Sequence, residues 1–424
     1  MMPYANYLCD NSSYTTATGG KWHTMNGSSH GNVFPNESRA FWAERFADAK
    51  QNFGTAQGAF WNDHMSENMD NYAEMKSVPG AMRQWMAGQA DAALASSTPI
   101  MYCMEKPSQM VQAVEFPAVT TGRASSDYHP PSANWFLGPE SLLLAAIGKS
   151  ASKDGINTGA APNHEGVTEV NPVLHTLTAT LTRGPVSVGD RIGKTNFTVL
   201  KPCCSSSGTI LSPSHALKPI DATYQPGSVA NGLQFTGVWG AAQAVWTAFS
   251  EVGTAAAYTV LAVSLPEEYP MKPTELWPAP PANSSLWAFD WGATSCAAGR
   301  PVTGCLRAVT DESPLLLSTP PETRSRGSVV HGLQHSVVTR EMPGGWVVLG
   351  EPAKYVPLSP ARFTVVSATQ PGERLGPSAL TLAVRGAPGE VVEVLLKKPG
   401  LTVLTMVTMS IGVTGVAQAT VSAN

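Results

Sequence analysis

The chain has 424 residues, of which only 14% are charged, and its formal net charge is −4. This length is enough for two or three domains with cores of their own. Basic residues form no stripe, which argues against a nucleic-acid partner. The 38 glycines and 34 prolines, together with abundant Ser, Thr and Ala, indicate a largely neutral, hydroxyl-rich surface of the kind found in many secreted and carbohydrate-handling proteins.

The six cysteines follow no metal-binding pattern. No CxxC occurs and no Cys/His set has zinc spacing, so we expect no metal site. Cys296 and Cys305 flank a short Gly/Ala/Pro loop and could close a disulfide. Glycosylation sequons occur at Asn11, Asn26, Asn36, Asn196 and Asn283. Sequons and pairable cysteines together favour a secreted or cell-surface protein.

The two ends of the sequence bear on location. The start, MMPYANYLCD, has neither the charged beginning nor the apolar run of a signal peptide. Two interpretations stay open: a cytoplasmic protein with a genuine start, or a chain that lacks its true N-terminus. Residues 401–417 are uncharged but contain Thr and Gly and partly alternate, so they predict strand rather than a membrane helix.

Apolar stripes and short β-branched runs alternate between residues 37 and 125. Helical spacing predicts helices over 38–53, 78–95 and 108–114, and strands are expected at 58–61, 99–104 and 116–125. Each strand leads into polar residues that include an acid. This alternation predicts parallel βα units, whose strands deliver side chains to a site at their carboxyl ends. Further along the chain we expect helices at 140–147 and 172–182 and another strand end at 184–189.

From about residue 220 the pattern changes to short alternating runs separated by turns, which predicts an antiparallel β-sandwich. Residues 266–330 hold ten prolines and are expected to form long loops across its edge. No phosphate-binding loop, GxSxG, HExxH or EF-hand motif occurs in the sequence. We therefore expect no cofactor and exclude a nucleotide-dependent enzyme.

Three motifs together resemble the raffinose synthase and alkaline α-galactosidase-type glycoside hydrolases. They are RASSDY at 123–128, MYCME at 101–105 and GPVSVGDRIGKTNFTVLK at 184–201. The resemblance covers roughly residues 37–400, and the third motif is the most specific. It implies the second half of a (β/α)8 TIM barrel in residues 1–200, followed by a connector and a C-terminal β-sandwich in residues 201–424. It also implies that the first barrel strands are missing, and that a second polypeptide could supply them.

The family uses two carboxylates, a nucleophile and a general acid/base, about 5–5.5 Å apart in a retaining mechanism. By position, Asp63 in the segment Asn62-Asp63-His64 matches the nucleophile. The acid/base position of the family falls on Ser126, and a hydroxyl cannot protonate a leaving oxygen as a carboxylic acid does. Three possibilities stay open: Asp127 takes over, Glu105 serves instead, or the site binds a sugar without cleaving it. Arg123, His64, His129 and Trp135 are the candidate substrate-binding residues.

Two functions follow from this interpretation. The first is a glycoside hydrolase or transglycosidase that acts on α-galactosides by the two-carboxylate mechanism. The alternative is a catalytically inactive relative that serves as a secreted or surface carbohydrate-binding or assembly glycoprotein. The partner expected in both cases is an oligosaccharide or glycan.

Overall fold

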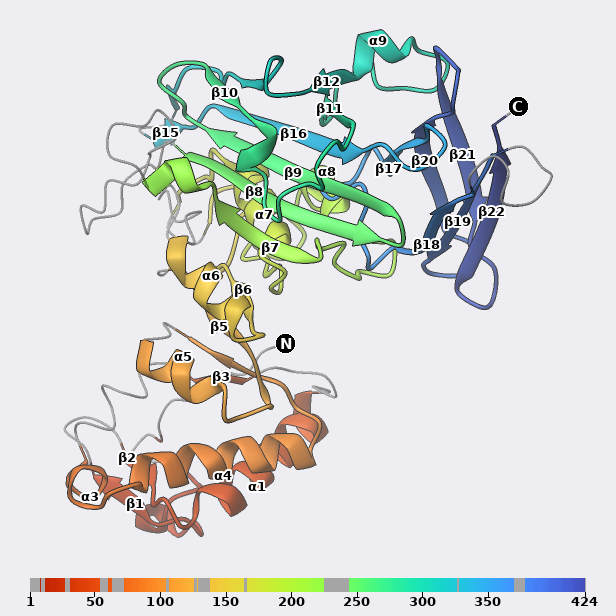
Figure 1. The fold of residues 1–424 in the computed structure, drawn as a ribbon. Coiled ribbons are helices and arrows are strands. Elements are labelled where there is room, and N and C mark those ends of the chain that lie inside the picture. The colour runs from red at the N-terminus through yellow and green to blue at the C-terminus, as the bar shows by residue number, and fades with distance from the viewer. Residues whose placement is uncertain are drawn as a thin grey trace. The chain divides into compact units, whose positions relative to one another are not determined.

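A computed structural model describes residues 8, 12–26, 31–53, 60–62, 72–103, 107–125, 128, 138–163, 166–224, 244–325, 328–369 and 378–423. The chain divides into two compact units (Figure 1). Unit 1 comprises Met1–Ser126 and Leu143–Ser152, and unit 2 comprises Asp127–Leu142 and Lys153–Asn424. Each unit has its own core, and the two are described separately.

Two long helices carry the core of unit 1. Helix α1 (Ser38–Phe53) packs against α4 (Ala81–Ala95) through aromatic side chains at helical spacing. Trp42 and Trp85 are both fully buried, with ring centres 5.6 Å apart and nearly perpendicular. The helices expected at 38–53 and 78–95 are thus confirmed, the second one three residues shorter. Nearby lie the hairpin β1 (Thr24–Asn26) and β2 (Gly31–Val33), the 3-10 turn η1 (Thr16–Thr18) and the short helix α3 (Ala73–Ser77).

A four-stranded parallel sheet completes unit 1. Its strands lie in the order β3 (Phe60–Asn62), β4 (Ile100–Tyr102), β5 (Val119–Arg123) and β6 (Ser150–Ser152). Helix α5 (Pro107–Ala113) connects β4 to β5, and α6 (Gly138–Ala146) precedes β6. The parallel pairing of the three strands expected between residues 58 and 125 is confirmed.

The partial (β/α)8 barrel expected for residues 1–200 is wrong. Closing a barrel needs eight strands tilted and staggered around a common axis, whereas the described part of this sheet has four short strands in an open row. Residues 184–189, expected to be a further strand end, form only a one-residue parallel bridge between Val188 and Ile156. Pro185 lacks the amide hydrogen that a longer ladder needs, so this segment adds no strand.

A six-stranded antiparallel sheet forms the centre of unit 2 (Figure 1). Its residues alternate between two cores: Val260 and Ala262 of the central strand β9 enter one, and Leu261 and Val263 enter the other. Helix α7 (Pro172–Leu181) packs in the second core. The strands lie in the order β12 (Arg307–Val309), β11 (Leu286–Asp290), β16 (Leu333–Arg340), β9 (Ala255–Val263), β8 (Ala244–Val252) and β7 (His215–Pro219).

Two three-stranded sheets at the C-terminal end of unit 2 share a third core, to which Val394 and Leu382 contribute fully buried side chains. The first contains β17 (Val347–Gly350), β20 (Val391–Lys397) and β21 (Leu404–Ser410). The second contains β18 (Phe363–Ala368), β19 (Ala379–Arg385) and β22 (Val416–Ser422). The strands of the C-terminal half thus belong to several sheets, which corrects the expectation of one sandwich after residue 200.

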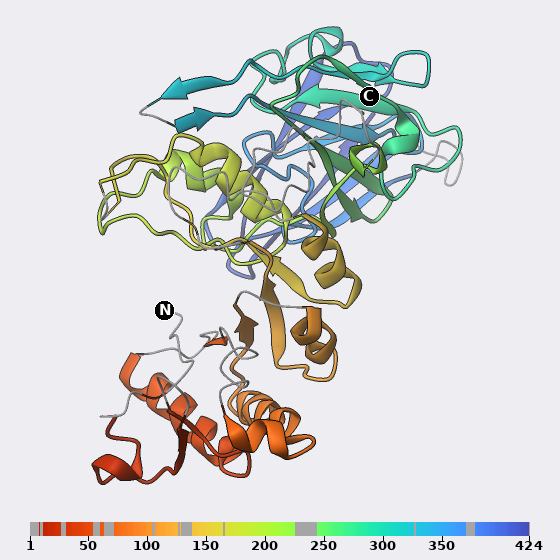
Figure 2. The ribbon, with the colours of Figure 1, turned by 90° about the vertical axis from the view of Figure 1, so that its left-hand side faces the viewer.

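Short elements surround the six-stranded sheet. The hairpin of β14 (Thr323–Ser325) and β15 (Ser328–Val330) extends beyond it on the side of α7 (Figure 2). Strand β10 (Tyr269–Met271) pairs with β13 (Leu315–Leu317). The remaining elements are α8 (Phe197–Leu200), η2 (Lys201–Cys203), η3 (Asp221–Tyr224), η4 (Pro273–Glu275) and α9 (Val302–Cys305).

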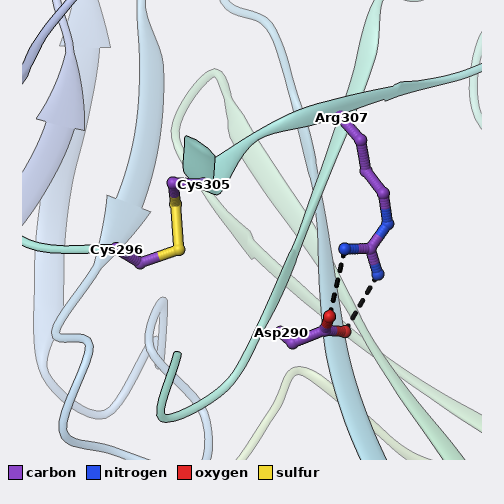
Figure 3. The surroundings of a disulfide bond; sticks show 4 residues. All are labelled: Asp290, Cys296, Cys305 and Arg307. Carbon is purple, nitrogen blue, oxygen red and sulfur yellow. Dashed lines mark hydrogen bonds and ion pairs between the residues drawn. A yellow bond between two sulfur atoms is a disulfide. The ribbon is translucent and has the colours of Figure 1, made fainter. Parts of the chain in front are cut away.

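The expected disulfide between Cys296 and Cys305 is present, with the two Cα atoms 4.9 Å apart (Figure 3). It ties the loop after β11 to α9. The carboxylate of Asp290 at the end of β11 accepts two hydrogen bonds from Arg307 on β12, at 2.9 and 3.1 Å. The bidentate ion pair thus joins the two ends of the loop between β11 and β12, and the disulfide joins two points within that loop.

Candidate functional site

Most of the sequence-predicted site residues, Asp63, His64, Glu105, Asp127, His129 and Trp135, lie outside the described residues. Arg123 is described, and it is buried at the carboxyl end of β5, opposite Ser152 of β6. The strand register brings Asn62, Tyr102 and Gly122 into one row across β3, β4 and β5. The strand end that precedes Asp63 therefore lies beside its two neighbours, at the carboxyl-terminal edge of the parallel sheet.

A surface depression of about 500 Å³ lies in unit 2. Lys218 of β7 and Asp221 of η3 line one part of it, and Tyr269 of β10 lines another. The segment from Lys272 to Ala279, which includes η4, completes the lining. Two sequence regions about fifty residues apart thus form one pocket.

Trp277 is the exposed aromatic side chain of this pocket, with 45% of its surface accessible. The side-chain nitrogen of Lys218 lies 4.7 Å from the ring centre, and the His215 ring stands nearly perpendicular to it at 5.3 Å. The next residue is held in place, because the Tyr258 hydroxyl donates a 2.8 Å hydrogen bond to the Pro278 carbonyl. An indole positioned in this way is a rigid apolar platform at the surface.

The acidic residues of the pocket differ in their surroundings. Glu275 accepts hydrogen bonds from the Tyr269 hydroxyl and, at 2.7 Å, from the Lys272 amide, so both of its oxygens hold the loop together. Asp221 is almost fully exposed and lies 3.9 Å from the Lys218 nitrogen. Burial lowers the pKa of Lys218, and the charge of Asp221 opposes this effect. The two carboxylates of the pocket thus differ: Glu275 is held by two donors of its own loop, whereas Asp221 faces solvent beside Lys218.

A second polar cluster lies at Tyr128, the last residue of the RASSDY motif. Its hydroxyl donates a 2.5 Å hydrogen bond to Glu169 and accepts one from the Asn157 amide. The Nε2 atom of His175 lies 3.3 Å from Glu169, and the Lys153 nitrogen lies 4.2 Å from the centre of the Tyr128 ring. Glu169, His175 and Lys153 are all buried.

Burial sets the charge states in this cluster. It raises the pKa of Tyr128, with a contribution from the Glu169 carboxylate, and it lowers the pKa of Lys153 to about 7. Burial also lowers the pKa of His175, assisted by the charge of Lys153, so this imidazole is neutral. Because Tyr128 and Glu169 already bind each other and Glu169 also accepts a 2.6 Å hydrogen bond from the Asn171 amide at the start of α7, we assign the cluster a structural role.

The family motif at 184–201 also serves the fold. Asp190 accepts hydrogen bonds from the amide and the hydroxyl of Thr158, at 2.9 and 2.6 Å. The Thr158 hydroxyl in turn accepts a hydrogen bond from the Asn196 amide at 2.7 Å. These contacts give Asp190 a structural role, because it links residue 158 to the motif.

Three of the five sequons have described side chains, those at Asn36, Asn196 and Asn283. Asn36 and Asn283 are exposed. Asn196 is partly exposed and caps α8, where its side-chain oxygen accepts a hydrogen bond from the Thr198 amide at 3.1 Å. Asn11 lies outside the described residues, as does the side chain of Asn26.

The pocket at Trp277 was not among the expected sites, because the proline-rich stretch 266–330 was expected to form loops. The signal that could have found it is the segment Thr274–Pro278, in which a tryptophan is flanked by Leu276 and a proline. A large aromatic residue among prolines has no regular strand or helix in which to be buried. Within the described parts of the chain, no group of His, Cys, Asp or Glu could hold a metal ion. A search of the same parts finds no helix long and apolar enough to cross a membrane.

Comparison with models of known families gives no match, and comparison with curated proteins gives no significant similarity. The resemblance to the raffinose synthase and alkaline α-galactosidase-type hydrolases therefore stays a prediction.

Proposed function

We propose that this chain is a carbohydrate-binding protein and that the pocket around Trp277 receives a neutral pyranose unit. The observation that carries the proposal is the exposed indole of Trp277 at a depression lined by Lys218, Asp221 and Tyr269. A pyranose presents a face of C–H groups, which gains by contact with an aromatic ring, and hydroxyls, which need donors and acceptors beside it.

The charges of the pocket favour a neutral ligand. Lys218 and Lys272 are matched in number by Asp221 and Glu275. A uronic or sialic acid would need a surplus of positive charge, and a cationic sugar a surplus of negative charge. The expected ligand is therefore a neutral hexose, such as the galactose of an α-galactoside.

The test is a fluorescence or calorimetric titration of the full chain with neutral oligosaccharides that carry terminal galactose or glucose. We expect Trp277→Ala to weaken binding at least tenfold, which corresponds to about 1.4 kcal/mol. The matched control is Phe197→Ala, because Phe197 is another exposed ring, at 64% exposure, on α8 of the same unit. Equal binding by wild type and Trp277→Ala, or binding by neither, would exclude the proposal.

A second candidate function is the retaining glycosidase, which the strand register in unit 1 supports. In the sequence, the aligned positions Asn62, Tyr102 and Gly122 precede the acids at 63, 105 and 127 by one, three and five residues. Its test is hydrolysis of an aryl α-galactoside by wild type and by Asp63→Asn. Turnover that disappears in the variant supports this candidate, whereas no turnover by folded wild type leaves glycan binding as the function of the chain.

A further inference from the structure

Two adjacent cysteines in unit 2 form a distinct chemical group. Cys203 ends the turn η2 and Cys204 follows it, and both are thiols. Cys203 is buried in the core shared by α7, β7 and Tyr355, whereas Cys204 is partly exposed. The sulfur of Cys204 lies 3.9 Å from the carbonyl oxygen of Leu200. Cys204 is thus the more accessible residue of the pair, and Cys203 is covered by the core.

A cationic side chain lies at the same turn. The nitrogen of Lys354 donates hydrogen bonds to the carbonyls of Lys201 and Cys204, at 2.9 and 2.6 Å. Two carboxylates act on this group, Glu390 on Cys204 and Glu351 on Lys354, and Arg362 pairs with both, at 2.5 and 2.8 Å. The positive charge of Lys354 therefore favours a thiolate on Cys204.

The hydrogen bond from Cys203, assisted by the charge of Lys354 and opposed by burial and by Glu390, lowers the pKa of Cys204 to about 6. The same hydrogen bond, together with burial, raises the pKa of Cys203. These opposite shifts favour the thiolate form of the partly exposed Cys204 and the thiol form of the buried Cys203. Thiolates, not thiols, react with peroxides and other electrophiles.

We propose that Cys203 and Cys204 form an oxidisable thiol pair, in which Cys204 reacts with a hydroperoxide and Cys203 then closes a vicinal disulfide. In the first step the Cys204 thiolate attacks the terminal peroxide oxygen and the O–O bond breaks. The leaving hydroxide or alkoxide takes a proton to become water or an alcohol. In the second step the Cys203 sulfur attacks the Cys204 sulfenic acid, and a second molecule of water leaves. Two electrons pass from the thiol pair to the peroxide, and this inference does not depend on glycan binding.

The expected product is easily reduced. Consecutive Cα atoms lie about 3.8 Å apart, which is shorter than the span of roughly 4.4–6.8 Å in ordinary disulfides. The permanent disulfide of the chain, Cys296–Cys305, spans 4.9 Å. Strained disulfides belong to the labile, regulatory class, so we expect the Cys203–Cys204 bond to be reversible while Cys296–Cys305 persists.

The test treats the folded full chain with an equimolar amount of hydrogen peroxide and maps the peptides by mass spectrometry. We expect the wild-type peptide that holds both residues to lose two hydrogen atoms, and to regain them with a mild dithiol reductant. Cys203→Ser should instead accumulate a sulfenic acid that dimedone traps on Cys204, and Cys204→Ser should stay unmodified. A dimedone adduct on wild-type Cys204 with no disulfide, or a first reaction at Cys203, would overturn the proposal.

A second measurement does not depend on the folding of any variant. The rate of iodoacetamide alkylation of wild-type Cys204 should follow a titration centred near pH 6, as the thiolate fraction does. Lys354→Met should slow alkylation at pH 7 several-fold, whereas the control Lys194→Met, at an exposed lysine, should not. A midpoint above pH 8 in the wild type would contradict the assigned role of Cys204.

Discussion

The side-chain nitrogen of Lys218 lies over the ring of Trp277, 4.7 Å from its centre. This contact joins strand β7 to the loop after η4 and places a hydrogen-bond donor directly beside the aromatic platform. Because Lys218 covers part of one ring face, the sugar that we propose would stack on the exposed part of the ring, next to this donor.

Replacing Lys218 by Met keeps the apolar stem beside the ring and removes the donor. We expect glycan affinity to fall about tenfold, because a hydrogen bond from a charged donor contributes roughly 1.5–3 kcal/mol. The free energy of unfolding should change by no more than about 1 kcal/mol, the range of a surface cation–π contact. Titration and urea unfolding measure the two quantities, with Lys194→Met, at an exposed lysine that does not line the pocket, as control. Unchanged affinity in Lys218→Met would show that Lys218 only holds the ring.

Arg362 is a buried cation between two carboxylates. Its Nε lies 2.8 Å from Glu351 and a terminal nitrogen lies 2.5 Å from Glu390, and Arg362 itself is only 1% exposed. Arg362→Met should lower the free energy of unfolding by about 3–5 kcal/mol, because it leaves two carboxylates without their partner. Urea unfolding checks this, and the triple variant Arg362→Met/Glu351→Gln/Glu390→Gln should regain part of the loss. A triple variant less stable than the single one would contradict the electrostatic explanation.

Lys153 predicts a pH dependence of stability. Burial lowers its pKa to about 7 in the folded state, whereas an unfolded lysine titrates near 10.4. Between these values the unfolded chain binds more protons, so the contribution of Lys153 to stability rises with pH by up to about 1.4 kcal/mol per unit. Below pH 7 both states are protonated and the slope from this group vanishes. Urea unfolding between pH 7 and 10 should show the rise in wild type and in Lys194→Met but not in Lys153→Met. If stability rises with pH as steeply in Lys153→Met as in wild type, the pH dependence comes from another group.

The helices and the parallel strands of unit 1 were predictable from local patterns. Trp42 and Phe46 repeat at the helical period, and the helix they predict is α1. Whether the parallel sheet closes into a barrel or stays open was not predictable. The outcome depends on the number of strands and on their stagger, which no local sequence pattern encodes. The family resemblance predicted a barrel, whereas the described part of unit 1 contains an open parallel sheet of four strands.

The pocket at Trp277 was beyond prediction for a related reason. Lys218 and Trp277 lie about sixty residues apart, and only the pairing of β7 in the large sheet and of β10 with β13 brings their segments together. By contrast, the two cysteines of the Cys296–Cys305 disulfide are nine residues apart, so their spacing in the sequence was enough to predict the bond. Contacts that are close in sequence could be anticipated, and those that need the sheet topology could not.

Reducing the Cys296–Cys305 disulfide should destabilise unit 2. A cross-link over a loop of this length restricts the unfolded chain by about 2–3 kcal/mol. The double variant Cys296→Ser/Cys305→Ser should lose that amount in urea unfolding under non-reducing conditions, and wild type in strong reductant should lose a similar amount. The control is Asp290→Asn, which weakens the nearby ion pair with Arg307 and keeps the disulfide; because this pair is 40% exposed, we expect a loss of at most about 1 kcal/mol. A double variant as stable as wild type would show that the loop is already fixed by its packing.

The turn between β8 and β9 contains Gly253 with φ of +60°. This positive φ, at the first of two residues joining paired strands, is the pattern of a type II′ hairpin, which favours glycine. A side chain here would also meet another strand, since a Cβ atom on Gly253 would lie 2.4 Å from the Val366 carbonyl of β18. That carbonyl accepts a 3.1 Å hydrogen bond from the Thr254 amide, so it cannot withdraw without breaking the contact.

Gly253→Ala should therefore lower the free energy of unfolding by at least about 2 kcal/mol, the sum of backbone strain and the displaced strand. The matched control is Gly292→Ala, because Gly292 has φ of +75° but a Cβ atom there would meet nothing within 4 Å. This control measures the backbone strain alone, which we expect to lower the free energy of unfolding by about 1 kcal/mol. Urea unfolding of both variants separates the two contributions, and equal losses would mean that β18 moves away from the hairpin at no cost.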